Sequence, residues 1–391
     1  MKNHILILFI LAFLLSCLVA MLTPYIPLYG EDIGMPIATI GYLVALYHLA
    51  QFFGRIPMGT ISDVIGYKKT IGFGGLSLFF SAICYIASPA FSPLLFIAQI
   101  LLGITVCMEW VTLPAYVSRF AQDKIPFFTF IIGWAYTFSI PFGGFLKDNF
   151  GMNSIFYLAL LVSVVALFLI AVLWRIAPSQ SEVEGKDLSS HSVISLYKSS
   201  FKTLKNPKIM RASLYSFLMF LNLNISFSLF PLHLSRLGLT ASIIGIIQFA
   251  RAGASSSVRL LSKRVEEKIG REKILIIGTL TAGFCLISLT MVESFSLIVL
   301  ISIIWGLGGA LYAPVVFTLI SEGTSAGDRG KGMGIRGMVG TFGSFTGIIV
   351  FSNIAETFST SLSISLAGLF IILGVGVTEL LMRRKFGQKK I

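Results

Sequence analysis

The sequence is poor in charged side chains, and acidic ones are the scarcest. Only 12% of its 391 residues are charged, with 17 Asp and Glu against 30 Lys and Arg, whereas 55% are hydrophobic. Together with a mean hydropathy of +0.89, this composition excludes a soluble domain, because a water-exposed surface needs many more charges. The chain is therefore expected to lie in a lipid bilayer.

Several chemistry-bearing motifs are also missing. The four cysteines lie within apolar runs at no metal-ligand spacing, so neither a metal site nor a cofactor is expected. The sequence contains no Gly-x-x-x-x-Gly-Lys-Ser/Thr phosphate loop, and no His-x-x-x-His pair, carboxylate cluster or Ser-His-Asp set near a membrane face. These absences disfavour an ATP-driven pump and a membrane-embedded enzyme.

The sequence contains instead apolar runs of about 20 residues, each long enough to cross ~30 Å of hydrocarbon as a helix. These runs lie within residues 5–29, 37–61, 70–87, 93–117, 126–146, 153–174, 212–234, 243–261, 274–292, 295–320, 333–353 and 361–382. The first run lacks a signal-peptide cleavage pattern and leads straight into the second, so we interpret it as a retained span. The sequence thus predicts an all-α membrane protein with twelve transmembrane helices.

The positive charges orient these spans. With the N-terminus placed in the cytoplasm, 25 of the 30 basic residues fall in cytoplasmic segments, and only Lys147 and Arg236 fall in outside loops. The positive-inside rule therefore predicts that both termini and the central loop are cytoplasmic. The cytoplasmic location of the basic residues accounts for the net charge of +13, so no nucleic-acid partner is expected.

One long polar segment, residues 177–208, separates six spans from six. Sliding the second half back by 204 residues aligns 230–273 with 26–69 without a gap, which indicates a duplication. The aligned pairs include Pro27 with Pro231, Gly34 with Gly238, Gly41 with Gly245, Arg55 with Arg259 and Gly66 with Gly270. We expect two six-helix bundles, residues 1–176 and 209–391, in a parallel pseudo-twofold repeat, joined by a cytoplasmic linker, residues 177–208.

A short charged turn follows the second span of each copy. The first turn carries Gly59, Asp63, Gly66, Lys68 and Lys69, and the second carries Glu267, Gly270, Arg271 and Lys273. A carboxylate here can accept bonds from a neighbouring helix N-terminus, while the basic side chains can pair with acids across the two halves. Such bonds would hold the cytoplasmic ends of the two halves together. The alternative is that the turns only orient the loops by their charge.

The whole chain resembles a twelve-helix member of the major facilitator superfamily. The first charged turn matches that family's signature, with Val64 in place of a basic residue. A glycine-rich segment of the fifth span resembles that of the family's antiporters; it comprises Gly133, Pro141, Gly143 and Gly144. The resemblance implies a secondary transporter that works by alternating access, with the charged turns gating its cytoplasmic side.

Arg251 is the most informative single residue. It lies roughly 12 Å into its span, near the bilayer midplane, where an unpaired guanidinium costs at least ~2.5 kcal/mol. We expect it to bind an anionic group of the substrate, or alternatively to form a structural ion pair with Glu109. The expected substrate cavity comprises Tyr47, His48, Asn222, Asn224, Arg251, Trp305 and Tyr312. Arg55 and Arg259, near cytoplasmic helix ends, are interpreted as snorkelling.

Glu109 is the acid placed well inside a span. Burial would suit it to proton coupling, whereas a nearby arginine would make it a fixed salt bridge. The sequence favours a monomeric plasma-membrane transporter for proton-coupled efflux of an amphipathic small molecule. One alternative is an organic-anion importer or exchanger that uses Arg251. An alternative of another class, a non-transporting receptor or an embedded enzyme, is disfavoured by the short outside loops and the duplicated turns.

Overall fold

A computed structural model describes residues 3–121, 124–176, 193–259, 262–324 and 329–386, and every regular element in these ranges is a helix. The first half contains α1 (Asn3–Asp32), α2 (Ile37–Ile65), α3 (Tyr67–Ala87), α4 (Leu94–Phe120), α5 (Ile125–Phe150) and α6 (Met152–Ile176). The second half contains α7 (Val193–Thr203), α8 (Pro207–Phe227), α9 (Leu229–Arg236), α10 (Ala241–Arg259), α11 (Ser262–Ile269), α12 (Arg271–Leu289), α13 (Phe295–Gly309), α14 (Tyr312–Gly323), α15 (Arg329–Thr357) and α16 (Thr360–Phe386).

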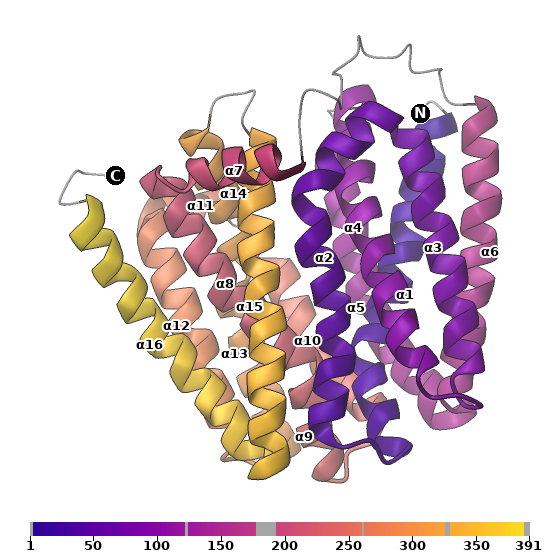
Figure 1. The fold of residues 1–391 in the computed structure, drawn as a ribbon. Coiled ribbons are helices and arrows are strands. Elements are labelled where there is room, and N and C mark those ends of the chain that lie inside the picture. Colours follow the sequence, from indigo (N-terminus) through magenta and orange to yellow (C-terminus); the bar gives the residue numbers. More distant parts are fainter. Residues whose placement is uncertain (1–2, 122–123, 177–192, 260–261, 325–328, 387–391) are drawn as a thin grey trace.

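The helices form an upright bundle in which both termini lie at one end (Figure 1). We call this the terminal end, and the other the opposite end. Among the described residues, ten stretches are long and apolar enough to cross a membrane, and two of them consist of a helix pair, α8 with α9 and α13 with α14. Helices α5 and α10, of 26 and 19 residues, complete the twelve spans. The predicted all-α membrane fold is confirmed.

Backbone geometry marks equivalent points in the two copies. Gly34 and Gly238 have φ angles of 75° and 82°, and Gly66 and Gly270 have φ angles of 90° and 83°. Residues with a Cβ rarely adopt such angles, so each glycine permits a sharp break between consecutive helices. Both pairs are 204 residues apart, the spacing of the sequence repeat.

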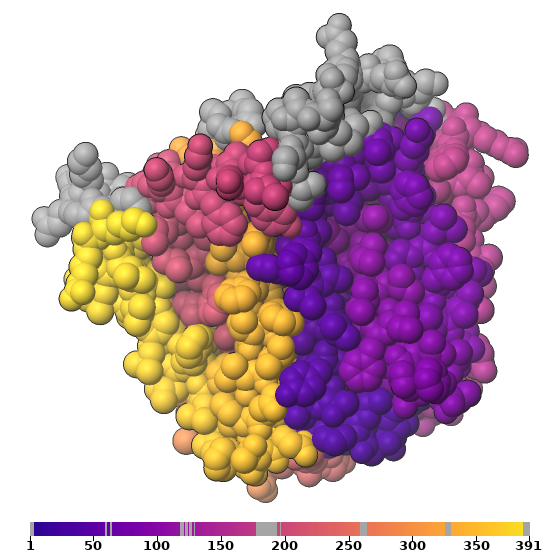
Figure 2. Space-filling model, viewed as in Figure 1, coloured from indigo at the N-terminus to yellow at the C-terminus, as the bar shows by residue number. Residues whose placement is uncertain are grey.

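The two halves meet along α2 and α15 and along α5 and α10. Figure 2 shows the first of these seams as a continuous contact between the indigo surface of the first half and the orange surface of α15. At Gly41 the backbone of α2 lies directly against Ser352. Nearer the terminal end, Ile56 packs in one cluster with Ile335 and Met338. The seam therefore follows α2 over much of its length.

Large apolar side chains cover the outer surface of the bundle. Phe168 and Phe150 are each 67% exposed, and Tyr157 is 61% exposed. A surface of this kind would associate in water, whereas hydrocarbon chains solvate it. Polar side chains such as Gln51, Glu109 and Arg251 are instead buried inside the bundle.

Candidate functional site

Two carboxylates close the seam at the opposite end, each by capping a helix of the other half. Asp148, in the last turn of α5, accepts hydrogen bonds from the N–H groups of Ala241 (3.0 Å) and Ser242 (2.7 Å) at the start of α10. Glu356 of α15 accepts one from the N–H of Ile37 (2.5 Å), the first residue of α2. Both acceptors also meet the positive end of a helix dipole. Ile37 and Ala241 are 204 residues apart, so the closure follows the symmetry of the repeat.

The glycine-rich segment of α5 lets the backbones approach at this closed end. A Cβ on Gly144 would lie 2.4 Å from the Ala241 carbonyl oxygen, and one on Gly245 would lie 2.8 Å from the Cα of Pro141. Such separations are possible only without side chains. Pro141 and Gly144 therefore lie at the seam of α5 with α10.

The other two members of that segment have different surroundings. Gly143 faces α1, where a Cβ would lie 2.7 Å from the Tyr25 ring. The Tyr25 hydroxyl donates a hydrogen bond to the Ile140 carbonyl oxygen (2.6 Å) and so fixes α1 to α5. A Cβ on Gly133 would meet no atom of the described residues within 4 Å. Close approach of α1 thus explains why a glycine stands at position 143, but it does not explain the glycine at position 133.

Removing the two caps is expected to weaken the closed opposite end. Asp148→Ala and Glu356→Ala should each cost about 1 kcal/mol, the usual contribution of a helix cap, and the two losses should add because the caps lie on different helices. Thermal unfolding in nanodiscs measures the effect. Exposed Glu293, with no hydrogen bond or ion pair to a described residue, provides the matched control, and equal unfolding temperatures for Glu293→Ala and the cap variants would contradict the role of the caps.

The Asp148 cap should also depend on pH. This residue follows the apolar stretch 126–146 of α5. Burial alone would raise the pKa of Asp148, but hydrogen bonds from Ser242, Thr240 and the Ala241 N–H lower it below the ordinary value of 3.8. A lowered pKa means that the ionised cap stabilises the folded form above that value and loses this contribution as the pH falls through the folded pKa. The difference between wild type and Asp148→Ala should therefore persist at pH 5 and shrink below about pH 4.

The first charged turn lies at the terminal end. Lys68 Nζ donates to the carbonyl oxygen of Trp174 in α6 (3.5 Å), and the Trp174 indole N–H donates to the Lys68 carbonyl oxygen (3.0 Å). Lys69 is exposed on α3. Gly59 and Asp63 belong to α2, but their side-chain surroundings lie outside what the structure describes. Gating by this turn stays a prediction.

The second charged turn forms a chain of ion pairs within its own half. Arg271 pairs with both Glu266 and Glu322, and Glu322 also accepts from Lys208 at 2.8 Å. Glu267 and Lys273 are exposed. The described ion pairs of this turn do not cross the seam. Any cross-seam latch made by these residues would therefore belong to another conformation.

Arg251 is buried in α10 and is held by residues of its own half. Its Nε donates to Gln248 Oε1 at 2.8 Å, and its Cζ lies 5.0 Å from the Trp305 ring centroid and 5.1 Å from that of Phe227. These contacts are cation–π interactions with two aromatic faces. Among the described residues Arg251 has no carboxylate partner, and the ion pair with Glu109 that the sequence allowed is not formed.

Other predicted cavity residues gather around the same region. The Trp305 indole N–H donates to Asn222 Oδ1 at 3.1 Å, which links Asn222 to the Arg251 cluster. His48 of α2 lies close to Asn224 of α8 across the seam, and the Tyr47 ring stands edge-on to His48 with centroids 4.9 Å apart. The structure therefore brings the predicted cavity residues into two neighbouring groups, one inside the second half and one on the seam.

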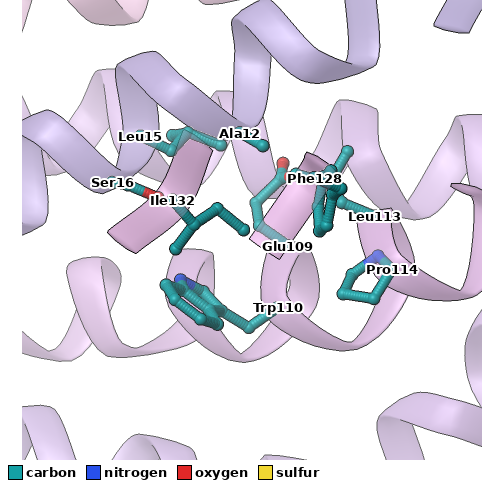
Figure 3. Close-up of a pocket in the computed structure, with 9 residues that line it drawn as sticks. All are labelled: Ala12, Leu15, Ser16, Glu109, Trp110, Leu113, Pro114, Phe128 and Ile132. Atoms are coloured by element: carbon teal, nitrogen blue, oxygen red, sulfur yellow. The ribbon is translucent and has the colours of Figure 1, made fainter. Parts of the chain in front are cut away.

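Glu109 lies apart from both groups, in a small cavity between α1, α4 and α5 (Figure 3). It is 2% exposed, and neither carboxylate oxygen has a hydrogen-bond partner among the described residues. Ser16 is the one polar side chain besides Glu109 in a lining that otherwise comprises Ala12, Leu15, Trp110, Leu113, Pro114, Phe128 and Ile132. The cavity of about 10 Å³ has room for roughly one water molecule.

The surroundings of Glu109 decide its chemistry. An ionised carboxylate that accepts no hydrogen bond and has no cation beside it is strongly disfavoured in an apolar environment. Gly74 of α3 makes room for the carboxylate, because a Cβ there would lie 2.5 Å from Glu109 Oε1. The site is thus suited to holding a proton and unsuited to holding a fixed negative charge.

Sequence reasoning missed two arginines on the terminal-end side of the seam. The sequence predicts that Arg55 of α2 snorkels, but its Nε is buried and its guanidinium lies over the ring of Phe220 in α8. Arg336 of α15 lies over the same ring and beside Tyr312, a predicted cavity residue. One signal was available: Arg55 follows His48 by seven residues, so both share a face of α2.

Comparison with known proteins agrees with this geometry. A family model described as Major Facilitator Superfamily matches residues 8–265 and 212–390. Multidrug resistance protein 2 of Bacillus subtilis (strain 168) is 23% identical over 378 residues, which cover 94% of this chain and 92% of that protein. The uncharacterized MFS-type transporter YceJ of the same organism is 27% identical over 289 residues, covering 72% of this chain and 71% of that one.

Solved structures show the same fold. A D-xylose-proton symporter superposes with a TM-score of 0.77 at 17% identity, covering 98% of both chains. The nucleoside transporter NupG superposes with a TM-score of 0.71 at 16% identity over 100% of both chains. Since the family model spans nearly the whole sequence, the chain belongs to the major facilitator superfamily and is a multi-pass membrane transporter, not an enzyme.

Proposed function

We propose that this transporter exports an amphipathic small molecule in exchange for protons, and that Glu109 carries the proton. The observation that supports this most directly is the buried Glu109 carboxyl group, which lacks any hydrogen-bond partner among the described residues. The name of the relative Multidrug resistance protein 2 supports efflux of such a compound.

Proton binding at Glu109 gives a physical basis for coupling. The neutral acid is compatible with its apolar cavity, whereas loss of the proton leaves a buried charge without compensation. That charge favours a conformation in which water or a cation reaches the carboxylate. Proton release therefore biases one state of the transporter over the other, which is what a coupling site must do.

The movement is alternating access of two bundles, residues 1–176 and 209–391. The caps by Asp148 and Glu356 hold the opposite end shut in the conformation described above. Opening that end requires closure of the terminal end, where the charged turns of Asp63 and Glu267 are suited to act as a latch. The linker 177–208, which contains α7, joins the bundles.

The terminal end faces the cytoplasm of a plasma membrane in this proposal. This orientation is supported by the positive-inside rule, because 25 of the 30 basic residues fall in segments on that side. The protein works as a monomer, because each substrate pathway lies between the two halves of one chain.

Transport driven by an imposed proton gradient tests the proposal. In proteoliposomes that are acidic inside, we expect rhodamine 6G or fluorescein to accumulate through inside-out transporters, since proton exit then drives uptake. A protonophore should abolish the accumulation. Uptake that does not change when the gradient is removed would contradict proton exchange.

A second candidate function is import or exchange of an organic anion by Arg251. The specific observation in its favour is that Arg251 is buried without a carboxylate partner among the described residues. In this case the anion and the proton would move in the same direction. The imposed gradient would then expel fluorescein from the proteoliposomes, whereas proton-coupled export would accumulate it inside them. Arg251→Gln should then stop fluorescein transport and leave rhodamine 6G unaffected.

A further inference from the structure

Two arginines from opposite halves of the transporter meet at one aromatic ring. The Cζ atom of Arg55, on α2, lies 5.8 Å from the ring centroid of Phe220, and that of Arg336, on α15, lies 5.6 Å from it. Arg336 also lies 5.1 Å from the Phe317 centroid on α14. Two positive charges are therefore concentrated in the seam, near the terminal end.

Neither arginine is neutralised by the described part of the chain. Arg55 Nη2 donates to Gln51 Oε1 at 2.9 Å, and Arg336 lies beside the Tyr312 side chain. Both of these neighbours are uncharged. The Nε atoms of Arg55 and Arg336 are buried without a hydrogen-bond partner, and no described carboxylate forms an ion pair with either residue.

Such an arrangement is unfavourable without a counter-charge. Both side chains are half-buried, with the Nε atom of each removed from water, and each charge raises the electrostatic energy of the other. Arg211, by contrast, is a buried arginine that is paired with both Glu272 and Glu379. In the described part of the chain both charges therefore lack a counter-ion, and a bound anion would supply one.

The surroundings also define the rest of the ligand. Phe52 of α2 and Phe217 of α8 both pack on Phe342 of α15, with centroid separations of 5.7 and 6.2 Å. Phe220 lies on the same helix as Phe217, one turn away. These rings provide an apolar wall beside two planar donors of the kind that bind carboxylate, sulfonate or phosphate groups.

We propose that Arg55 and Arg336 together bind the anionic group of an aromatic or otherwise apolar organic anion, with Phe220 against its body. The site lies between the halves, because Arg55 belongs to the first and Arg336 and Phe220 to the second. Binding removes the repulsion between the arginines and draws α2 and α15 together, so that the cargo itself favours closure of the terminal end. The inference rests on the proposed export function and names its substrate class.

Binding to the purified, full-length protein in nanodiscs tests this assignment. Four probes differ in charge: 2-naphthoate, neutral 2-naphthylmethanol, a cationic naphthylmethyl-trimethylammonium and inorganic sulfate. We expect 2-naphthoate to bind best. Arg55→Gln and Arg336→Gln should each weaken its binding on the order of 10- to 100-fold, the range for one lost charge-assisted bond. Arg336→Lys should lose less, because it keeps the charge but not the planar fork.

Controls separate this site from others. The exposed Lys268 gives a matched control, and Lys268→Gln should bind 2-naphthoate as wild type does. Removing an unpaired buried cation should not lower the unfolding temperature of the ligand-free protein, so lost binding in Arg55→Gln or Arg336→Gln cannot be ascribed to misfolding. Phe220→Ala should weaken 2-naphthoate binding and leave any weak sulfate binding unchanged.

Four results would overturn the proposal. They are equal binding of 2-naphthoate and 2-naphthylmethanol, no binding of 2-naphthoate at all, sulfate binding as tight as that of 2-naphthoate, and a loss of binding in Arg251→Gln but not in the Arg55 and Arg336 variants. Because the assay measures binding alone, anion binding with no proton-driven transport would refute the proposed export function and leave this site in place.

Discussion

Glu109→Gln should abolish proton-driven uphill transport while leaving exchange of substrate across the membrane intact. Glutamine has nearly the shape of the neutral acid and suits the same apolar cavity, but it cannot release a proton. The transporter would therefore still change conformation with substrate bound, without being driven by the gradient. We expect the accumulation ratio of a transported dye to fall to about one, measured in proteoliposomes with an imposed pH gradient.

Two comparisons make that result specific to Glu109. Glu293→Gln changes an acid that is exposed outside the spans and should leave accumulation unchanged. Gly74→Ala should mimic part of the Glu109 defect, because its Cβ would lie 2.5 Å from the carboxylate oxygen and displace it. Full gradient-driven accumulation by Glu109→Gln would remove this residue from the coupling mechanism.

Gly144→Val should prevent closure of the opposite end and stop transport. The first added carbon would lie 2.4 Å from the backbone carbonyl oxygen of Ala241, and a backbone atom cannot move aside as the end of a flexible side chain can. The α5–α10 contact and the Asp148 cap would then be lost together. We expect transport to fall at least tenfold, with the population shifted to the state that is open at this end.

The same helix supplies the control for this substitution. Gly133 also belongs to the glycine-rich segment of α5, but an added Cβ there meets no described atom within 4 Å. Gly133→Ala should therefore transport as wild type does. Spin labels on Asn149 and Ser242 can report the separation across the closed end, and an unchanged separation in Gly144→Val would contradict the steric argument.

The fold was predictable because its signals are local or periodic. The length of each apolar run predicts a span. The 204-residue repeat aligns Gly66 with Gly270 in the sequence, and the two glycines have matching φ angles in the structure. The interrupted spans were not foreseen, since a break such as that at Ser228 between α8 and α9 leaves the apolar composition unchanged. Hydropathy measures how apolar a segment is and carries no information on where its backbone bends.

The sequence predicted which residues belong to the candidate sites much better than it predicted which of them contact one another. Arg251 and Glu109 stood out because charge is costly at depth in a membrane, yet the sequence could not show that Arg251 packs on Trp305 and Phe227. The helix caps that Asp148 and Glu356 form between the two halves could not be predicted for the same reason. Such contacts depend on which helix faces meet, and that is decided by three-dimensional packing.

Arg55 shows how a general rule can mislead at one position. Snorkelling explains most arginines near helix ends, and the same rule is the natural explanation for its repeat partner Arg259. In the structure the side chain of Arg55 is instead directed into the seam, toward Phe220. Residues seven apart lie on one side of a helix, so Arg55 and His48 share a face of α2. This shared face predicts that the Arg55 side chain is directed into the seam.

Proton flux driven by a substrate gradient is the most direct test of proton-coupled export. Proteoliposomes loaded with fluorescein and a separate pH indicator, with no initial pH gradient, should become more acidic inside as wild-type transporter releases the dye. The Glu109→Gln variant should release dye without acidification. Dye release by wild type with no accompanying proton movement would contradict exchange, and acidification by Glu109→Gln equal to that of wild type would assign the proton to another residue.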